Sequence, residues 1–442
     1  MATITSWFET LGNWVWGPLM LVLLVGTGVY FTIRLGGLQC RLLPYALKLA
    51  LSRKSNQGEP GEISPFQALM TAMAATIGTG NIAGVATAVV LGGPGAIFWM
   101  WLSALFGMST KYAEAFLAVY FRVIDDQGRA SGGPMYYIER GLNMKWLAIT
   151  FAFCGMLAAL GTGSSIQSNS VAQVVFNSSG VAPWITGLVM TVITGLVLMG
   201  GIQSIARVVS CIVPFMAIFY LTSGLIIIIM NYTLVIPALT LIIHDAFTGQ
   251  AVAGGAMGAA IRYGVARGVF SNEAGLGTAP IAAASARTTK PAEQGLISMT
   301  GTFLDTIIVC SVTGIILVMG NQYGGGVTGA ALTAQSFEAF LPGYGVWVVT
   351  IGLIFFSYST ILGWSFYGEK CAQYLMGDRV IKPYRIVYTA MVWVGTLITL
   401  DLIWAVSDAF NGLMAFPNLI GLLLLSGIVI KHNPLKAKDV NI

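Results

Sequence analysis

Charged residues are scarce in this chain. Of its 442 residues, 9% are Asp, Glu, Lys or Arg, and 56% are hydrophobic. Soluble domains carry about 25% charged residues, so this composition argues against a soluble protein and indicates one embedded in a lipid bilayer. The formal net charge of +5 identifies no partner by itself, and we expect no nucleic-acid partner.

Histidine and paired cysteines are also lacking. The chain has two histidines, His244 and His432, and its 5 cysteines are scattered without a CxxC spacing. This pattern predicts neither a disulfide framework nor a zinc site. Both histidines fall outside the apolar runs, so a serine nucleophile at membrane depth would lack an oriented base. We therefore expect no enzyme and no organic cofactor.

A basic segment is missing from the start of the chain, where Glu9 is the only charge before Met20. A cleaved signal peptide normally begins with a basic region, so the first apolar run is predicted to be a retained anchor. About 20 apolar residues suffice to cross a bilayer. Segments of this kind are predicted at about 15–34, 65–91, 95–121, 147–176, 182–200, 206–231, 255–285, 294–319, 346–374, 384–401 and 403–430.

Lysine and arginine fall in alternate loops. Between the first two spans, Arg41 and Lys48 alternate with leucines, which predicts an amphipathic helix at the membrane interface. Basic residues recur in every second loop after that, whereas the loops around Gly92, Ser178, 231–250, 321–344 and Asp401 contain none. Cytoplasmic loops are rich in basic residues, so the N-terminus is predicted outside and the tail 431–442 in the cytoplasm.

Two spans have polar, glycine-rich centres. The second contains Gly78-Thr79-Gly80-Asn81, and the seventh contains Gly275-Leu276-Gly277-Thr278. Helix packing through the GxxxG of Gly80 and Gly84 is one interpretation of the first. The spans also divide into one extra helix (15–34) and two repeats of five (65–231 and 255–430), which must insert in opposite orientations. Broken helices at matching places in inverted repeats are typical of secondary transporters.

Six blocks spread over most of the chain resemble the alanine/glycine:cation symporter family. They are residues 78–87 (GTGNIAGVAT), 92–101 (GGPGAIFWMW), 107–114 (GMSTKYAE), 131–137 (SGGPMYY), 268–280 (GVFSNEAGLGTAP) and 359–365 (STILGWS). The resemblance implies an all-α membrane protein of about eleven spanning helices with the leucine-transporter-like inverted repeat. It further implies a sodium-coupled carrier of alanine and glycine in a bacterial inner or archaeal cell membrane.

The same resemblance implies a sodium site between the first break and the ninth span. Its ligands would be the carbonyl oxygens of Ala74, Ile77 and Phe356 and the hydroxyls of Ser359 and Thr360. Hydroxyls inside membranes more often bond to carbonyls of their own helix, which is the alternative. A second cation could use Asn81 with Ser271. Sodium is favoured over a proton as the coupling ion.

For an amino-acid substrate, the carboxylate is predicted to meet the backbone N–H groups of Gly78, Thr79 and Gly80. The amine would meet carbonyls at Phe270 and Ser271, with the Asn272 side chain as a further candidate.

Three side chains are predicted to shape the pocket. The resemblance to the leucine-transporter-like fold implies that Phe270 is an aromatic lid over the substrate, with an ordinary packing role as the alternative. Trp364 lies one turn beyond Thr360 and would leave room only for a hydrogen or methyl side chain, with ordinary packing or a place in an interfacial aromatic belt as the alternatives. Gln167 offers an amide to either end of a zwitterion, with interhelical hydrogen bonding as the alternative.

Charged residues within spans are costly and are usually paired or functional. Lys111 and Glu114 are predicted to pair with each other, and Glu273 with Arg267 or Arg262, which would line an outer vestibule or gate. The sequence identifies no partner for Asp305.

A channel is the remaining alternative to a carrier, but it gives no reason for two breaks in inverted halves. We expect a monomer that binds a small amino acid.

Overall fold

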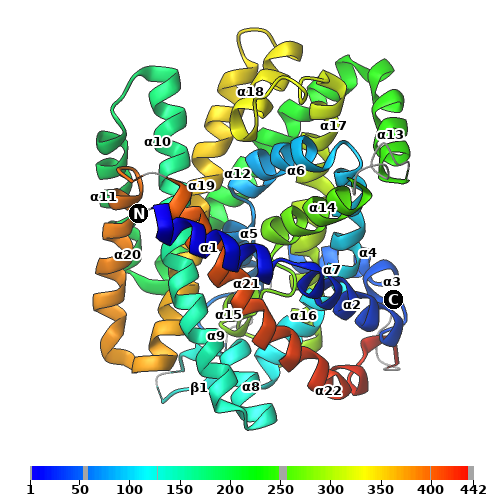
Figure 1. Cartoon of the computed structure of the whole chain (residues 1–442). Coiled ribbons are helices and arrows are strands. Elements are labelled where there is room, and N and C mark those ends of the chain that lie inside the picture. Colours follow the sequence, from blue (N-terminus) through cyan, green and yellow to red (C-terminus); the bar gives the residue numbers. More distant parts are fainter. Residues whose placement is uncertain (1, 53–57, 127, 248–255, 399, 437–442) are drawn as a thin grey trace.

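The computed structural model describes residues 2–52, 58–126, 128–247, 256–398 and 400–436. These residues form helices almost throughout, with one short hairpin (Figure 1). Before residue 256 the elements are α1 (Ala2–Val15), α2 (Pro18–Arg34), α3 (Leu38–Arg41), α4 (Leu43–Leu51), α5 (Pro65–Thr76), η1 (Gly80–Gly84), α6 (Val85–Gly92), α7 (Ala96–Tyr120), β1 (Val123–Ile124), β2 (Ala130–Ser131), α8 (Pro134–Leu142), α9 (Lys145–Ala158), η2 (Ala159–Ser165), α10 (Ile166–Ser179), α11 (Pro183–Met199), α12 (Gly201–Met230) and α13 (Tyr232–Phe247).

The second part of the chain is also helical. Its elements are α14 (Ala256–Asn272), α15 (Ala279–Ala284), α16 (Pro291–Thr302), η3 (Phe303–Cys310), α17 (Ser311–Gly320), α18 (Gly329–Phe340), α19 (Gly345–Met376), η4 (Asp378–Val380), α20 (Ile381–Gly395), α21 (Leu400–Leu424), α22 (Ser426–Lys431) and η5 (Pro434–Lys436). The segments η1, η2 and η3 are π-helical, and each continues directly into an α-helix.

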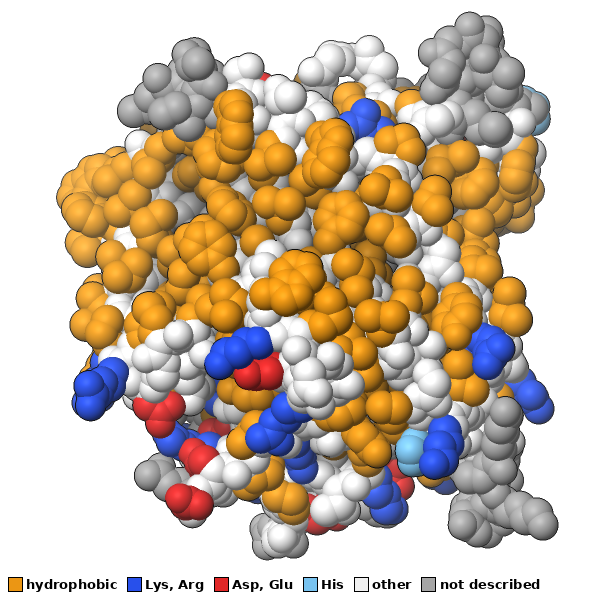
Figure 2. All heavy atoms as spheres, turned by 60° about the horizontal axis from the view of Figure 1, so that its bottom comes forward, with side chains coloured by type: hydrophobic (Ala, Val, Ile, Leu, Met, Phe, Trp, Pro, Cys, Tyr) orange, Lys and Arg blue, Asp and Glu red, His pale blue; other side chains and the backbone are white. Residues whose placement is uncertain are grey.

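The predicted spans coincide with helices, and the apolar surface suits a bilayer. Among the described residues, 4 helices are long and apolar enough to cross a membrane, or up to 6 if each sharply bent pair is one span. Figure 2 shows hydrophobic side chains in a broad band across one face, with most charged side chains gathered at one end of it. The protein is therefore a mostly helical, multi-pass membrane protein.

Several boundaries differ from the sequence-based prediction. The first apolar run is preceded by a separate helix, α1, which meets α2 at a bend of 41°. Gly17 and Pro18 mark this bend, because a proline is tolerated at the start of a helix but not within it. Two loops predicted at 231–250 and 321–344 contain the helices α13 and α18.

The predicted interfacial segment forms the short helices α3 and α4. The predicted beginning of the seventh span at residue 255, and residues 437–442 of the predicted tail, lie outside the described part of the chain.

The first break separates α5 from η1 and α6 by a bend of 51°. Helix α5 begins with a capping box, in which Ser64 accepts from the Gln67 N–H and the Gln67 side chain accepts from the Ser64 N–H. It ends at Thr76, and Ile77 takes an extended conformation. Gly78 is required here, because a Cβ atom at this residue would lie 2.5 Å from the Thr360 hydroxyl oxygen.

The second break lies between α14 and α15. Three of its residues have left-handed backbone conformations, with φ of 56° at Glu273, 90° at Gly275 and 84° at Gly277. Glycine adopts this conformation without strain, whereas glutamate does so at a cost. The two breaks contact each other, because a Cβ atom at Gly80 would lie 3.2 Å from the Cα atom of Ser271.

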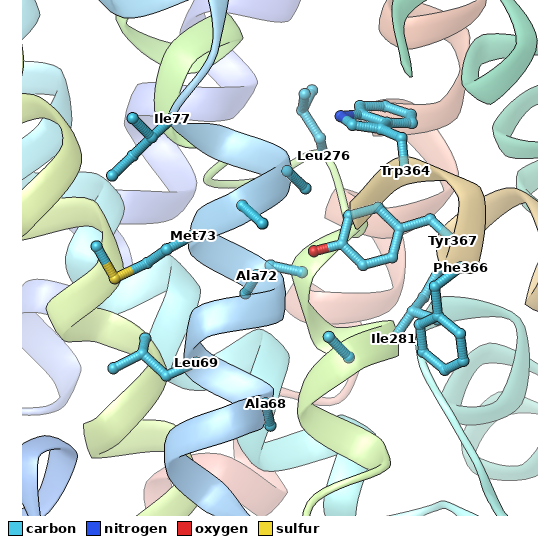
Figure 3. Packing of buried hydrophobic residues seen from close by; sticks show 14 of the residues in the cluster. Ala68, Leu69, Ala72, Met73, Ile77, Leu276, Ile281, Trp364, Phe366 and Tyr367 are labelled. Atoms are coloured by element: carbon cyan, nitrogen blue, oxygen red, sulfur yellow. The ribbon is translucent and has the colours of Figure 1, made fainter. Parts of the chain in front are cut away.

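The breaks are enclosed by an apolar core. Helix α5 is buried along most of its length against α12, α15, α16 and α19. Figure 3 shows Ala72 and Met73 of α5 in this core, with Leu276 of the second break and Trp364 and Tyr367 of α19 beside them. The irregular backbone therefore lies inside protein, where side chains can satisfy it.

Candidate functional site

The five predicted sodium ligands converge between α5 and α19. The Thr360 hydroxyl lies 3.1 Å from the Ala74 carbonyl oxygen and 3.3 Å from that of Ile77, and Ser359 lies 3.4 Å from that of Ala74. Both hydroxyls also reach the Phe356 carbonyl of their own helix, at 2.8 and 3.0 Å. The two alternatives raised by the sequence therefore coexist, because each hydroxyl bonds within α19 and across to the break.

This cluster has the chemistry of a small-cation site. Its carbonyl and hydroxyl oxygens are buried, and they come from two elements, the unwound end of α5 and the middle of α19. Hard monovalent cations are coordinated by oxygen atoms, and neutral oxygens can take such an ion without first losing a proton. The carbonyls are available because the helix ends at Thr76.

The predicted carboxylate cradle faces Gln167 of α10. The Gln167 amide oxygen lies 3.5 Å from the Thr79 backbone nitrogen, and its amide nitrogen lies 3.3 Å from the Thr79 hydroxyl. The Gly78 N–H donates instead to the Asn81 side chain, at 2.9 Å. Gln167 is thus adjacent to the cradle, whereas one of the three cradle amides already has a partner within the break.

Asp305, for which the sequence identified no partner, connects the two breaks. Its carboxylate is buried and accepts from Asn81 of the first break at 2.7 Å and from Ser271 of the second at 2.8 Å. Thr306 donates to the same carboxylate at 2.7 Å, and the Asn272 side chain donates to Thr306 at 3.0 Å. These contacts span 224 and 34 residues, so no local pattern reveals them.

The predicted ion pair between Lys111 and Glu114 is wrong in this structure. Lys111 donates to the Asn272 carbonyl at 2.8 Å, and Glu114 accepts from the Gly275 and Gly277 backbone N–H groups, each at 3.1 Å. The ion pairs found within the described residues do not include these two side chains. A break in a helix leaves backbone carbonyl and N–H groups without helical hydrogen-bond partners. Burying these groups unpaired is costly, so the two charged side chains bond to them and do not pair with each other.

The predicted pairing of Glu273 with an arginine is also wrong. Its carboxylate accepts from the Thr278 hydroxyl at 2.5 Å. Arg262 donates to Asn13 of α1, and the Arg267 guanidinium stacks over Phe270 at 5.8 Å.

Phe270 lies near the end of α14, and Trp364 lies in the middle part of α19. The Phe270 ring is 5.7 Å from that of Trp404, and Arg267 lies 5.9 Å from the Trp404 ring. Trp364 is 2% exposed and packs beside Gly163, where a Cβ atom would lie 2.2 Å from the tryptophan Cβ. Trp364 is therefore a buried side chain, with no place in an interfacial belt.

A cavity of about 670 Å³ leads to the first break from one end of the molecule. Thr79, Gly80 and Phe270 lie at its inner end, and residues of α10, α18 and α19 line its walls. A second cavity, of about 430 Å³, lies under α1 and shares Arg267, Phe270 and Trp404 with the first. Phe270 thus borders both cavities and lies next to the first break in the larger one.

At the opposite end, charged side chains line a third cavity, of about 520 Å³, whose lining includes no residue of either break. Arg385 pairs with Glu369 at 2.6 Å, and Lys370 lies 4.0 Å from Glu62. Burial raises the pKa of the Glu62 carboxyl, although Lys370 and Arg129 lower it. These contacts join α19, α20 and the segment before α5. The site is therefore accessible from the end opposite the basic loops.

The fold and the sequence both match known transporters. The structure of MhsT in complex with L-phenylalanine superposes with a TM-score of 0.61 at 11% identity, over 85% of this chain and 98% of that chain. A manganese transporter from Eremococcus coleocola superposes with a TM-score of 0.52 at 14% identity, over 82% of this chain and 78% of that one. The fold is thus that of the leucine-transporter-like carriers.

Relatives in sequence span nearly the whole chain. The sodium/alanine symporter AgcS of Methanococcus maripaludis is 56% identical over 97% of this chain and 96% of its own length. The probable sodium/glutamine symporter GlnT of Bacillus subtilis is 39% identical over 94% of this chain and 87% of its own length. The model of the sodium:alanine symporter family matches residues 1–435, and the chain therefore belongs to that family.

Proposed function

We propose that this protein takes up alanine, glycine or both with sodium, by alternating access. Sodium-coupled amino-acid symport is what its family does, and the choice of small neutral substrates is the finer inference. The observation that carries it is the convergence of the first break with α19 on one side and Gln167 on the other. Sodium and a carboxylate could then bind to the two ends of the same unwound segment.

The roles of the residues follow from their neighbours. Sodium would be held by the carbonyls of Ala74, Ile77 and Phe356 and the hydroxyls of Ser359 and Thr360, which already lie within hydrogen-bonding distance of one another.

The substrate carboxylate would meet the amides of Gly78, Thr79 and Gly80 and the Gln167 side chain. The backbone carbonyls of Phe270 and Ser271 would receive the amine. The Asn272 side chain would first have to release Thr306 and the Ala274 N–H.

A second cation at Asp305 is a further proposal. The buried carboxylate lies between the breaks, and the Ser271 and Thr306 hydroxyls can turn their oxygens toward an ion. A buried carboxylate is either stabilised in its ionised form by a cation or neutralised by a proton. Asn81, a candidate ligand from the sequence, donates to the same carboxylate.

The test of this second site is Asp305→Asn. We expect the sodium dependence of alanine uptake to change from cooperative to hyperbolic, because one of two coupled ions loses its charged ligand. An unchanged sodium dependence in an active variant would contradict it.

The architecture is proposed to consist of eleven spans, with 15–34 outside two inverted repeats at 65–231 and 255–430. The two broken helices, α5–α6 and α14–α15, lie at corresponding places in the proposed repeats and contact each other. Basic loops at one end support a cytoplasmic C-terminus and an external N-terminus. We expect the monomer to be the transporting unit, because the cavities and both breaks belong to one chain.

The decisive experiment is uptake into proteoliposomes. We expect labelled alanine to accumulate under an inward sodium gradient and not under a lithium or proton gradient of equal size. Unlabelled glycine and alanine should compete, whereas glutamine should not, because the pocket next to Trp364 is narrow. Accumulation driven by protons alone would overturn the choice of coupling ion, and competition by glutamine would overturn the choice of substrate.

A further inference from the structure

Lys111 and Glu114 lie one turn apart on α7, and both are buried, with 2% and 0% exposure. Within the described residues, neither forms a hydrogen bond with the five proposed sodium ligands between α5 and α19. Charged side chains in the interior of a membrane protein are expensive and need a physical reason. Here the second break explains these buried charges, because Lys111 contacts one end of the break and Glu114 contacts the other.

The two charges match the two ends of the break. The last carbonyl of α14, at Asn272, carries partial negative charge and receives the Lys111 ammonium. The N–H groups of Gly275 and Gly277 have no helical partner and both donate to Oε1 of Glu114. Side chains at i and i+3 share one helix face, so α7 presents a cation and an anion to successive parts of one loop.

A third side chain ties this arrangement to α21. Asn418 donates to Glu114 Oε1 at 2.6 Å and to the Gly275 carbonyl at 2.8 Å, and Tyr137 of α8 donates to the Asn418 side chain. Three donors therefore fall on a single oxygen of Glu114, and its other oxygen, Oε2, has no hydrogen-bond partner among the described residues.

We propose that Lys111 and Glu114 are positioning residues that hold the second break in register with the first. This inference rests on the proposed function, because its consequence is the placement of Ser271 and Asn272. Lys111 fixes the Asn272 backbone, and the two side chains at 271 and 272 then meet Asp305 and Thr306. Without these contacts the loop can shift by a fraction of an ångström and lose the substrate geometry.

The test compares Lys111→Met, which keeps an unbranched chain, and Glu114→Leu with Glu114→Gln, which keeps an acceptor oxygen. Tyr112→Phe is the matched control, because Tyr112 is buried between them on α7, packs against Gly295, and its hydroxyl has no hydrogen-bond partner in the described part of the chain. Measurements are alanine KM in proteoliposomes and the rise in melting temperature that alanine with sodium causes in purified protein.

We expect Lys111→Met and Glu114→Leu to raise the alanine KM by about ten-fold or more and to reduce the ligand-induced rise in melting temperature. Glu114→Gln should be milder, and Tyr112→Phe should match the unmodified protein. A lower melting temperature without ligand, but an unchanged KM and an unchanged ligand-induced rise, would mean a purely structural role and overturn the proposal.

The test still decides if the severe variants fail to fold, or if the unmodified protein shows no uptake. If both severe variants fail to fold, Asn418→Ala decides, because it keeps both charges and removes the α21 side chain that donates to Glu114 and to the Gly275 carbonyl; an unchanged KM there would overturn the proposal. If the unmodified protein shows no sodium-driven alanine uptake, the proposed function fails. The melting-temperature comparison, repeated with the amino acid that does stabilise the unmodified protein, then still tests the positioning role.

Discussion

At the scale of single residues, Trp364 is the side chain that we propose limits the size of the substrate pocket. Its side chain is buried between Gly163 and the second break, where its indole lies beside Glu273. Replacing it with leucine removes a large part of that volume. We predict that Trp364→Leu admits larger neutral amino acids, because it opens space at the end of the pocket that otherwise accepts no side chain larger than methyl. Discrimination between substrates that differ by one methylene is worth about 1–3 kcal/mol.

The measurement is competition of labelled alanine uptake by valine, leucine and glutamine. The control is Trp347→Leu, because Trp347 lies on the same helix but is 50% exposed on the surface. If Trp364→Leu kept the parental range of competitors, Trp364 would not line the pocket.

Thr360 is the residue on which the sodium site depends most. Its hydroxyl contacts the carbonyls of Ala74 and Ile77 as well as its own helix. Thr360→Val keeps the shape of the side chain and removes its oxygen. We therefore predict that the sodium concentration for half-maximal uptake rises about ten-fold, because losing one ligand costs roughly 1–2 kcal/mol of binding free energy.

Ser365→Ala is its control, because among the described residues the Ser365 hydroxyl bonds only to the Leu362 carbonyl of the same helix. Equal sodium dependence in the two variants would argue that α19 hydroxyls serve the helix alone.

At the scale of elements, the sequence predicted the two broken helices, because glycine and polar residues inside an apolar run are visible without any tertiary information. The partners of Asp305 were not predictable, since Asn81 lies 224 residues away. The Lys111–Glu114 prediction was wrong because the i, i+3 rule describes an isolated helix, and here the exposed ends of another helix compete for both charges.

Helix α13 was predicted as part of a loop because of its length. A single residue, Asn231, separates α12 from α13. With 16 residues, the apolar segment of α13 is too short to be recognised from the sequence as a membrane span of its own.

Arg267 of α14 connects that helix with Trp404 near the beginning of α21. Its guanidinium lies 5.8 Å from the Phe270 ring and 5.9 Å from the Trp404 ring, between the two cavities. Cation–π contacts of this kind are worth about 0.5–2 kcal/mol. We predict that Arg267→Gln weakens closure over the site and raises the alanine KM by about three-fold to ten-fold.

Arg262→Gln is the matched variant, because Arg262 lies on the same helix but bonds to Asn13 of α1. An equal effect of both arginines on the KM would favour a general electrostatic role over a lid.

At the scale of the whole molecule, the structure is open at one end and closed at the other. The cavity of about 670 Å³ reaches Thr79 and Gly80 from the end of α10 and α18, whereas ion pairs and buried carbonyl contacts of Arg122 close the other end. A carrier that alternates must close the first end when both ligands bind, since their binding energy is what shifts the equilibrium.

Cysteine accessibility measures this closure. Gln173 is exposed in the cavity, so Gln173→Cys should react from outside the cell with a membrane-impermeant thiol reagent, in a background where the exposed Cys40 and Cys211 are serine. We predict that sodium with alanine slows the reaction by about ten-fold, because the cavity narrows, whereas either ligand alone slows it less.

Tyr344→Cys provides the reference rate. Tyr344 is 73% exposed in the loop before α19 and outside the cavity, so its labelling should not depend on ligands. Labelling of both cysteines only from the cytoplasmic side would reverse the proposed orientation. If the labelling rate of Gln173→Cys were the same with and without sodium and alanine, closure at this end would be contradicted. The cavity would then be a permanently open vestibule, and the gate would lie deeper, at Phe270.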